Sequence, residues 1–205
     1  IGITTFLSGF GVRIFVKKFF RYEIKKITSL IYAGLGAVCV YAGIYSLFSK
    51  VALGANLGML LLCCFVIASG KKELANYVRV QKQSMTTGKC IFVFLMMLLF
   101  SYGASRGYLH FDSGLYHAQA IRWIEEYGVV PGLANLHCRL AYNSSAFVLT
   151  ALYSMEFLVG QSLHTVAGFM AFILVVKGLD VTGVFSRKKV LVSDFVKVAM
   201  LFYIS

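Results

Sequence analysis

Residues 28–69 read TSLIYAGLGAVCVYAGIYSLF, then SK, then VALGANLGMLLLCCFVIAS. The two apolar runs, 28–48 and 51–69, carry no charged residue and are separated only by Ser49 and Lys50. A helix of about 20 apolar residues crosses the roughly 30 Å hydrocarbon core of a bilayer, so the stretch predicts a transmembrane helical hairpin. Small residues let such helices pack closely. The candidate close-packing glycines are Gly34, Gly36, Gly54 and Gly58.

The composition is that of a membrane protein. The chain of 205 residues is 59% hydrophobic and only 14% charged, whereas soluble domains average about a quarter charged residues. The net charge of +12 would suit nucleic acid, but the basic residues lie in clusters between apolar runs rather than along one stripe. Such clusters are typical of cytoplasmic loops. We therefore expect an integral membrane protein with membrane lipids around it and no nucleic-acid partner.

The basic clusters also predict the orientation of the hairpin. Segment 17–26 (KKFFRYEIKK) has five bases and one acid, and segment 70–89 likewise has five bases and one acid. Positive loops stay in the cytoplasm, which places Lys50 outside. The apolar run 90–105 then crosses outward, so segment 106–140 is expected on the extracytoplasmic face. Its three arginines and three acids balance.

The orientation of the C-terminal part stays open. Segments 141–160 and 162–176 are further apolar runs, and the basic cluster 187–189 follows them. If both runs span, that cluster lies outside; if one is re-entrant or interfacial, it lies inside. Glu156, the one charged residue of the first run, is expected to face protein or water because a charge in lipid is costly.

The expected fold is all-α: a polytopic transmembrane helix bundle with an extracytoplasmic loop that contains an interfacial amphipathic helix. Residues 1–89 are expected to form N-terminal transmembrane helices with basic cytoplasmic loops. Residues 90–205 are expected to form a span, the outer loop 106–140 and the following membrane helices. Because the chain begins and stops inside apolar runs, we expect a fragment of a longer protein.

Segment 106–140, RGYLHFDSGLYHAQAIRWIEEYGVVPGLANLHCRL, holds the only Trp, the only Pro and three of the four His. Asp112 and Ser113 are good N-cap residues, and Gly128 and Pro131 would end the helix that follows. The predicted helix 113–127 is amphipathic and suits the membrane surface, with aromatic residues at head-group depth. One face carries Tyr116, Ala120, Trp123, Ile124 and Tyr127, and another carries Gln119, Arg122 and Glu126.

Asp112 is the candidate catalytic residue of this loop. Its carboxylate, just beyond the membrane exit, could ligate a divalent cation, accept a proton from an attacking hydroxyl, or simply cap the helix. His110 and His117 flank it, and they could bind metal, contact phosphate or sugar, or form structural hydrogen bonds. The five-residue step from Asp112 to His117 aligns the two poorly on a helix.

Polar residues continue after Pro131, at the mouth of the next apolar helix. The fork of Arg139 suits phosphate oxygens, although an interfacial anchor would also place an arginine there. The candidate substrate-binding residues of the whole segment are His110, Tyr116, His117, Asn135, His137 and Arg139.

The order of features resembles the first extracytoplasmic loop of the GT-C superfamily of membrane glycosyltransferases. The order begins with an apolar span, a short exit and an Asp that opens an interfacial helix. It continues with a Gly-x-Val-Pro turn (128–131), a polar stretch and an apolar helix. The sequence of residues 111–154 is similar to that of uncharacterised bacterial members linked to surface polysaccharide. It reads FDSGLYHAQAIRWIEEYGVVPGLANLHCRLAYNSSAFVLTALYS. The resemblance covers about residues 90–176.

The resemblance implies an enzyme that takes a sugar from a polyprenyl-phosphate-linked donor and transfers it to a glycan or lipid acceptor outside the cytoplasm. It implies a multi-pass protein of the bacterial cytoplasmic membrane. It further implies that Asp112 is the catalytic acid or the ligand of Mg²⁺ or Mn²⁺, and that Arg139 and His137 contact the carrier phosphate. Two positions depart from the pattern: Ser113 stands where many members have a second acid, and Arg139-Leu-Ala replaces a frequent Lys-Pro-Pro.

Other functions stay open from the sequence. A polysaccharide polymerase or ligase of another fold would depend on several arginines of outer loops rather than on Asp112. A transporter would line a path with intramembrane polar residues. A non-catalytic scaffold that holds partner enzymes is a further alternative.

Overall fold

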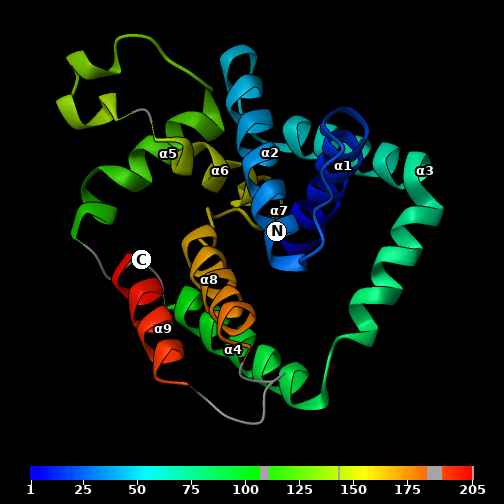
Figure 1. Ribbon diagram of the computed structural model, residues 1–205. Helices are drawn as coiled ribbons and strands as arrows, with labels where there is room; N and C mark the ends of the chain where they lie inside the picture. Colours follow the sequence, from blue (N-terminus) through cyan, green and yellow to red (C-terminus); the bar gives the residue numbers. More distant parts are fainter. Residues whose placement is uncertain (107–110, 143, 184–190, 205) are drawn as a thin grey trace.

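The computed structural model describes residues 1–106, 111–142, 144–183 and 191–204, and within them it is helical, with no strand. The prediction of an all-α fold is therefore confirmed. Figure 1 shows the helices in chain order. They are α1 (Gly2–Phe20), α2 (Ile27–Phe48), α3 (Leu53–Gln83), α4 (Thr87–Ser105), the π turn η1 (Ser113–His117), α5 (Ala118–Glu126), the 3₁₀ turns η2 (Leu133–Asn135) and η3 (Cys138–Ala141), α6 (Ser145–Tyr153), α7 (Glu156–Val159), α8 (Val166–Thr182) and α9 (Val192–Ile204).

Helices α2, α3 and α4 are long and apolar enough to cross a membrane, which indicates a membrane protein. The apolar run 28–48 coincides with α2, but α3 does not stop at the end of its apolar run. It bends at Gly70 (φ −126°, ψ 21°) and continues to Gln83. The prediction of a loop over residues 70–83 was therefore wrong, because Lys, Arg, Glu and Gln favour helices.

Backbone contacts join α1 to α2. Gly9 lies against the carbonyl of Leu30, and Gly34 lies against the carbonyl of Thr5, so that a Cβ at either position would overlap backbone of the neighbouring helix. Gly54 and Gly58 face tyrosine hydroxyls of α2, whereas Gly36 has no neighbour within 4 Å of a Cβ. Close packing is thus confirmed for three of the four predicted glycines and wrong for Gly36.

The end of α5 is joined to the connection between α2 and α3 by main-chain hydrogen bonds. Val51 donates its N–H to the carbonyl of Ile124 (3.0 Å), and Val129 donates to the carbonyl of Ser46 (2.9 Å). Gly128 has φ +80°, and a Cβ at this position would lie 2.7 Å from the carbonyl oxygens of both Ser46 and Ser49. Only glycine therefore fits this turn. The segment after α4 therefore lies at the same end of the hairpin as Lys50.

The two basic segments meet at the opposite end of the hairpin. The Lys25 carbonyl accepts hydrogen bonds from the Tyr77 hydroxyl (3.2 Å) and from Gln81 Nε2 (2.9 Å). Nearby, Lys17 of α1 forms a salt bridge with Glu73 of α3 (3.0 Å). This arrangement matches the sequence-based grouping, with segments 17–26 and 70–89 at one end and segment 106–140 at the other.

The apolar run 141–160 does not form one long helix. Helix α6 has nine residues, Met155 then takes a left-handed conformation (φ 55°), and the single-turn helix α7 begins at Glu156. Glu156 is exposed, so it does not face protein, and the expectation that it faces water stays a prediction. The run is thus divided into two short helices, and the choice between the two arrangements stays open.

Helix α8 runs antiparallel to α4, beside it in Figure 1. Near the start of α8, a Cβ at Gly168 would lie 3.4 Å from Cβ of Ala104 in α4. Near its end, Asp180 forms a 2.8 Å salt bridge with Lys89 at the start of α4. Helix α8 therefore ends at the basic end of the hairpin. The cluster 187–189 that follows lies outside the described residues.

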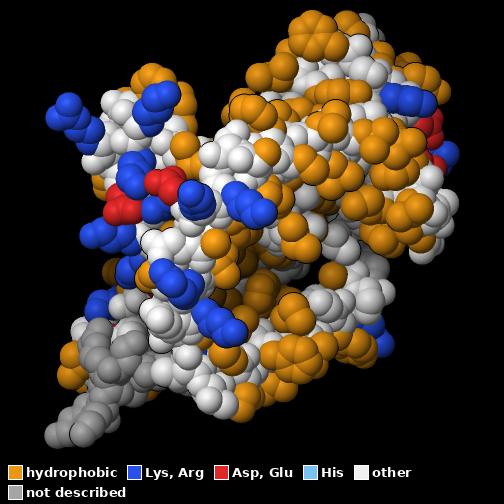
Figure 2. All heavy atoms as spheres, turned by 90° about the vertical axis from the view of Figure 1, so that its right-hand side faces the viewer, with side chains coloured by type: hydrophobic (Ala, Val, Ile, Leu, Met, Phe, Trp, Pro, Cys, Tyr) orange, Lys and Arg blue, Asp and Glu red, His pale blue; other side chains and the backbone are white. Residues whose placement is uncertain are grey.

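Large apolar side chains cover much of the outer surface. Figure 2 shows hydrophobic side chains over most of one face, with lysine and arginine side chains gathered along one side of it. Helix α4 has no buried residue, and Ile91, Phe94 and Leu98 are about half exposed. Such surfaces suit contact with lipid, which does not penalise apolar groups.

The glycine contact predicts a position-specific effect in α2. Gly34→Ala should destabilise the protein by about 1–3 kcal/mol, since its Cβ would push α1 and α2 apart. Gly36→Ala, two residues further on, should be neutral or stabilising because alanine favours helix and meets open space. Thermal unfolding of both variants in detergent measures the difference. Equal unfolding temperatures would contradict the packing role of Gly34.

Candidate functional site

Asp112 does not cap a helix. Residues 111–126 are continuously helical, and Asp112 itself has helical backbone angles (φ −63°, ψ −25°) with no capping hydrogen bond from its side chain. Instead, Arg139 Nη1 donates to Asp112 Oδ1 at 3.1 Å. The capping interpretation was therefore wrong, and the pair joins two residues that are 27 positions apart in the chain.

The five residues after Asp112 form the π turn η1. A π turn bonds residue i to i+5 and is frequent at functional sites. Its wider turn places Tyr116 and His117 out of the ordinary helical register with α5. The face of α5 that is buried in the protein carries Ala120, Ile121 and Glu125, whereas Tyr127 is exposed, and the predicted location of the aromatic face at the membrane surface stays a prediction.

A chain of aromatic rings begins at the guanidinium of Arg139. Its Cζ lies 5.2 Å from the centre of the Tyr116 ring, within the range of a cation–π contact. Tyr116 stacks on Tyr142 with ring centres 5.9 Å apart, and it meets the ring of His117 edge-on at 4.4 Å. His117 in turn lies 5.0 Å from Phe147 at the start of α6.

His137 completes this group from the far side of the polar stretch. Its Nδ1 accepts a hydrogen bond from the backbone N–H of Arg139 (3.2 Å), which fixes the turn that carries the arginine. We name the group the Asp112 cluster. It consists of Asp112, Tyr116, His117, His137, Arg139 and Tyr142.

The structure thus gathers most of the predicted site residues, with two exceptions. Asn135 is exposed at the end of η2, and its Nδ2 folds back toward Gly132, 3.4 Å from where a Cβ there would lie. No contact joins it to Asp112 among the described side chains, and its role in substrate binding stays a prediction. His110 lies outside the described residues.

The cluster is open enough for a substrate to reach it. The side chains of Asp112 and Arg139 are 32% and 44% exposed. Partly exposed ion pairs contribute only about 0–1 kcal/mol to stability, so opening this pair costs little. A phosphate that binds Arg139 with two oxygens could therefore replace Asp112 as its partner.

A metal ion fits the cluster less readily. Among residues 1–106, 111–142, 144–183 and 191–204, no group of three His, Cys, Asp or Glu side chains converges well enough to hold one. Divalent cations such as Mg²⁺ need several oxygen ligands, and Arg139 already shares one oxygen of Asp112. A cation at Asp112 would have to displace the arginine.

A second polar group, which the sequence did not reveal, lies on the other side of α5. Glu125 is only 5% exposed, and its Oε1 accepts a hydrogen bond from Ser162 Oγ at 2.7 Å. His164 Nε2 lies 3.1 Å from the same hydroxyl oxygen. Since the single hydroxyl proton points to Glu125, Nε2 of His164 must carry a proton and donate it.

Burial lowers the pKa of His164, and the charge of Glu125 opposes that shift. Because the folded state binds the second proton of the imidazole less tightly than the unfolded chain does, His164 contributes a stability that is present at neutral pH and is lost as the pH falls through the ordinary histidine range. Glu125 and Ser162 are 37 residues apart in the chain. The one sequence signal for the burial of Glu125 was its spacing of four residues from Ile121.

This arrangement predicts the response of His164 to a mutation. Glu125→Gln removes the negative charge that holds the proton, so the pKa of His164 should fall further below its ordinary value. NMR titration of the labelled imidazole in micelles measures it. Glu126→Gln is the matched control, because Glu126 pairs with Arg122 on the exposed face. A rise of the pKa in Glu125→Gln would contradict the contact.

Comparison with known proteins places the chain in a family. The family model described as "Domain of unknown function (DUF8201)" matches residues 1–205, so the chain belongs to that family. No curated protein and no solved structure matches it.

Proposed function

We propose that the chain is part of an integral membrane glycosyltransferase of the GT-C type, which transfers a sugar from a polyprenyl-phosphate-linked donor to a glycan or lipid acceptor. The observation that carries this proposal is the pairing of Arg139 with Asp112 (3.1 Å) within a partly exposed cluster of aromatic and histidine side chains. An acid that can accept a proton and an arginine that can bind phosphate are the two groups that the reaction requires.

The position of the cluster supports an extracytoplasmic site. The segment that carries it is bonded to the α2–α3 connection, at the end of the hairpin away from the basic segments 17–26 and 70–89. If those lysines lie in the cytoplasm, as the positive-inside tendency predicts, the Asp112 cluster faces outward. In a bacterial cytoplasmic membrane, a lipid-linked sugar exposed on the outer leaflet would meet it at the membrane surface.

In the proposed reaction Asp112 acts as the general base. Its carboxylate takes the proton of the acceptor hydroxyl while the acceptor oxygen forms a bond to the anomeric carbon of the donor sugar. The bond between that carbon and the phosphate oxygen breaks, and the electron pair leaves with the polyprenyl phosphate. Arg139 stabilises the negative charge of this leaving group.

Exchange of partners by Arg139 would prepare the base. In the structure the guanidinium holds Asp112, and a nearby positive charge makes a carboxylate a weaker base. Binding of the donor phosphate by Arg139 would remove the arginine charge from Asp112 and make its carboxylate a stronger base for the acceptor proton. Tyr116 would keep the arginine in place, since its ring contacts the guanidinium from the side.

The assignment of Asp112 predicts a large kinetic effect. Asp112→Asn in the full-length protein should lower kcat by about 10²–10⁴-fold, the usual contribution of a general base, without preventing membrane insertion. Radiolabelled sugar transfer from a polyprenyl-phosphate donor measures it. The matched control is Glu126→Gln, an exposed carboxylate on α5 that pairs with Arg122 and should keep full activity.

The same assay separates this enzyme from a polymerase or ligase that depends on arginines alone. Here both Asp112→Ala and Arg139→Ala should be inactive, and Arg139→Lys should retain only weak activity because lysine lacks the two-oxygen fork. Full activity in Asp112→Ala together with loss in Arg139→Ala would instead support the arginine-dependent alternative.

The proposed orientation has its own test. Cysteine-free protein carrying only Cys138, which is exposed, or only Lys50→Cys should react with a membrane-impermeant thiol reagent on intact spheroplasts. Lys82→Cys should react only after permeabilisation, because it lies at the basic end. Labelling of Cys138 from the cytoplasmic side alone would rule out an extracytoplasmic Asp112 cluster.

A further inference from the structure

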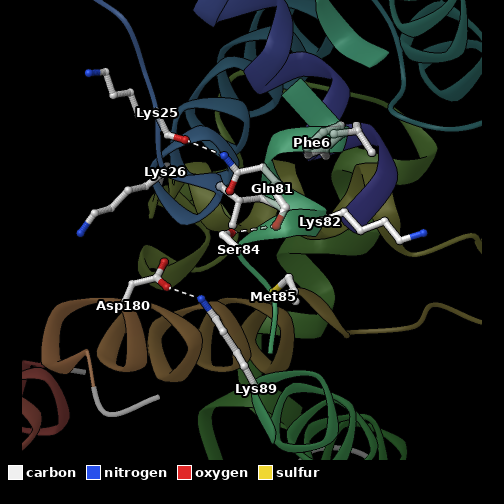
Figure 3. Close-up of a pocket in the computed structure, with 11 residues that line it drawn as sticks. Phe6, Lys25, Lys26, Gln81, Lys82, Ser84, Met85, Lys89 and Asp180 are labelled. Carbon is white, nitrogen blue, oxygen red and sulfur yellow. Dashed lines mark hydrogen bonds and ion pairs between the residues drawn. The ribbon is translucent and has the colours of Figure 1, made fainter. Parts of the chain in front are cut away.

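A cavity of about 600 Å³ opens at the basic end of the helices, far from the Asp112 cluster along the hairpin. It lies between the start of α2, the last turns of α3, the start of α4 and the end of α8 (Figure 3). Volumes of 300–1,000 Å³ are typical of small-molecule sites. The cavity is therefore large enough for part of a lipid.

Positive charge dominates the residues that line this cavity. Four lysines and one acid contribute to it: Lys25, Lys26, Lys82, Lys89 and Asp180. Asp180 is already matched, because Lys89 Nζ donates to its Oδ1 (2.8 Å) and the Thr28 hydroxyl donates to its Oδ2 (2.8 Å). Within the part of the chain that the structure describes, Lys25, Lys26 and Lys82 have no salt-bridge partner.

Charged and apolar side chains both line the cavity, and Lys89 and Asp180 pair with each other. Figure 3 shows the chains of Lys25 and Lys26 extending on one side and that of Lys82 on the other, away from the centre. Phe6, Ile27, Val78 and Met85 also line the cavity. This combination suits a molecule with an anionic head and an apolar tail better than a small soluble anion.

The lining of the cavity is held in place by contacts between helices. Tyr77 and Gln81 of α3 both donate hydrogen bonds to the Lys25 carbonyl, just before α2. Lys89 joins the start of α4 to the end of α8 through Asp180. The lysine backbones are therefore positioned by the fold, and only their side chains need to reorient toward a ligand.

The cavity also lies at the depth of a membrane surface. Helix α2 begins at Ile27, directly after Lys26, and α4 begins at Thr87, a few residues after Lys82. Both are candidate spans, so the lysines stand where the hydrocarbon region would end. Basic pockets between transmembrane helices at this level bind anionic lipid head groups.

We propose that this cavity is a binding site for an anionic phospholipid, with its phosphate held by Lys25, Lys26 and Lys82 and one acyl chain against the apolar side chains of the lining. The site is independent of the Asp112 cluster, so the transferase assignment stands or falls separately. A phosphate group could also come from a soluble molecule, and the experiment distinguishes the two sources.

Native mass spectrometry of the full-length protein in detergent, titrated with phosphatidylglycerol or phosphatidylcholine, tests the site. Each lysine near a membrane surface contributes about a five-fold gain in affinity for anionic lipid. The triple variant Lys25→Gln, Lys26→Gln, Lys82→Gln should therefore bind phosphatidylglycerol about 100-fold more weakly. The wild type should prefer phosphatidylglycerol to phosphatidylcholine, and inorganic phosphate at millimolar concentration should not displace the lipid.

The matched control removes the same charge from exposed positions at the same end: Lys18→Gln, Lys71→Gln, Lys72→Gln. Its affinity should stay within about two-fold of the wild type. An equal loss in both triple variants would overturn the proposal in favour of diffuse surface charge. Displacement of the lipid by inorganic phosphate, or equal binding of the two lipids, would also overturn it. Should the first triple variant not fold, Val78→Trp, which enlarges an apolar side chain of the lining, must weaken binding instead.

Discussion

The main-chain hydrogen bonds between α5 and the α2–α3 connection determine how the rest of the structure is arranged. A backbone group near the membrane that lacks a partner costs several kcal/mol, and the connection over residues 49–52 leaves such groups between two helices. The carbonyl oxygens of Ile124 and Ser46 accept the N–H groups of Val51 and Val129 across the junction. Because Gly128 turns tightly against the same carbonyls, the segment with Asp112 is fixed at this end rather than free to lie elsewhere.

At the opposite end, a salt bridge adds to the two hydrogen bonds that the Lys25 carbonyl accepts. Asp180 of α8 joins Thr28 of α2 to Lys89 of α4, and the side chains of Lys89 and Asp180 are only 20% and 11% exposed. Removing one member of so buried a pair leaves an uncompensated charge, which is strongly destabilising. Helices α4 and α8, which otherwise meet through apolar residues and Gly168, are thereby anchored to the hairpin with one register.

Hydropathy and charge were enough to predict the hairpin and which segments share an end, because both depend on the composition of whole runs. Hydropathy and charge did not predict whether a segment is a helix or a loop. Positive charge in residues 70–83 indicates where the segment lies with respect to the membrane, yet its residues are good helix formers and continue α3. The run 141–160 is mostly apolar but breaks at Met155, and its short helix α6 packs against α2 and α5.

The candidate site was predictable in its residues but not in its contacts. Asp112 could be recognised as unusual from its place between two histidines. Its contact with Arg139 could not be predicted, because Arg139 is 27 residues away and is positioned by the 3₁₀ turn η3 and by His137. The burial of Glu125 could not be predicted from the sequence. A buried acid requires a partner, and that partner, Ser162, comes from a loop beyond α6 and α7. The ion pair between Asp112 and the partly exposed Arg139 contributes little to stability. The same weakness that makes the pair a poor source of stability allows an incoming phosphate to exchange with it.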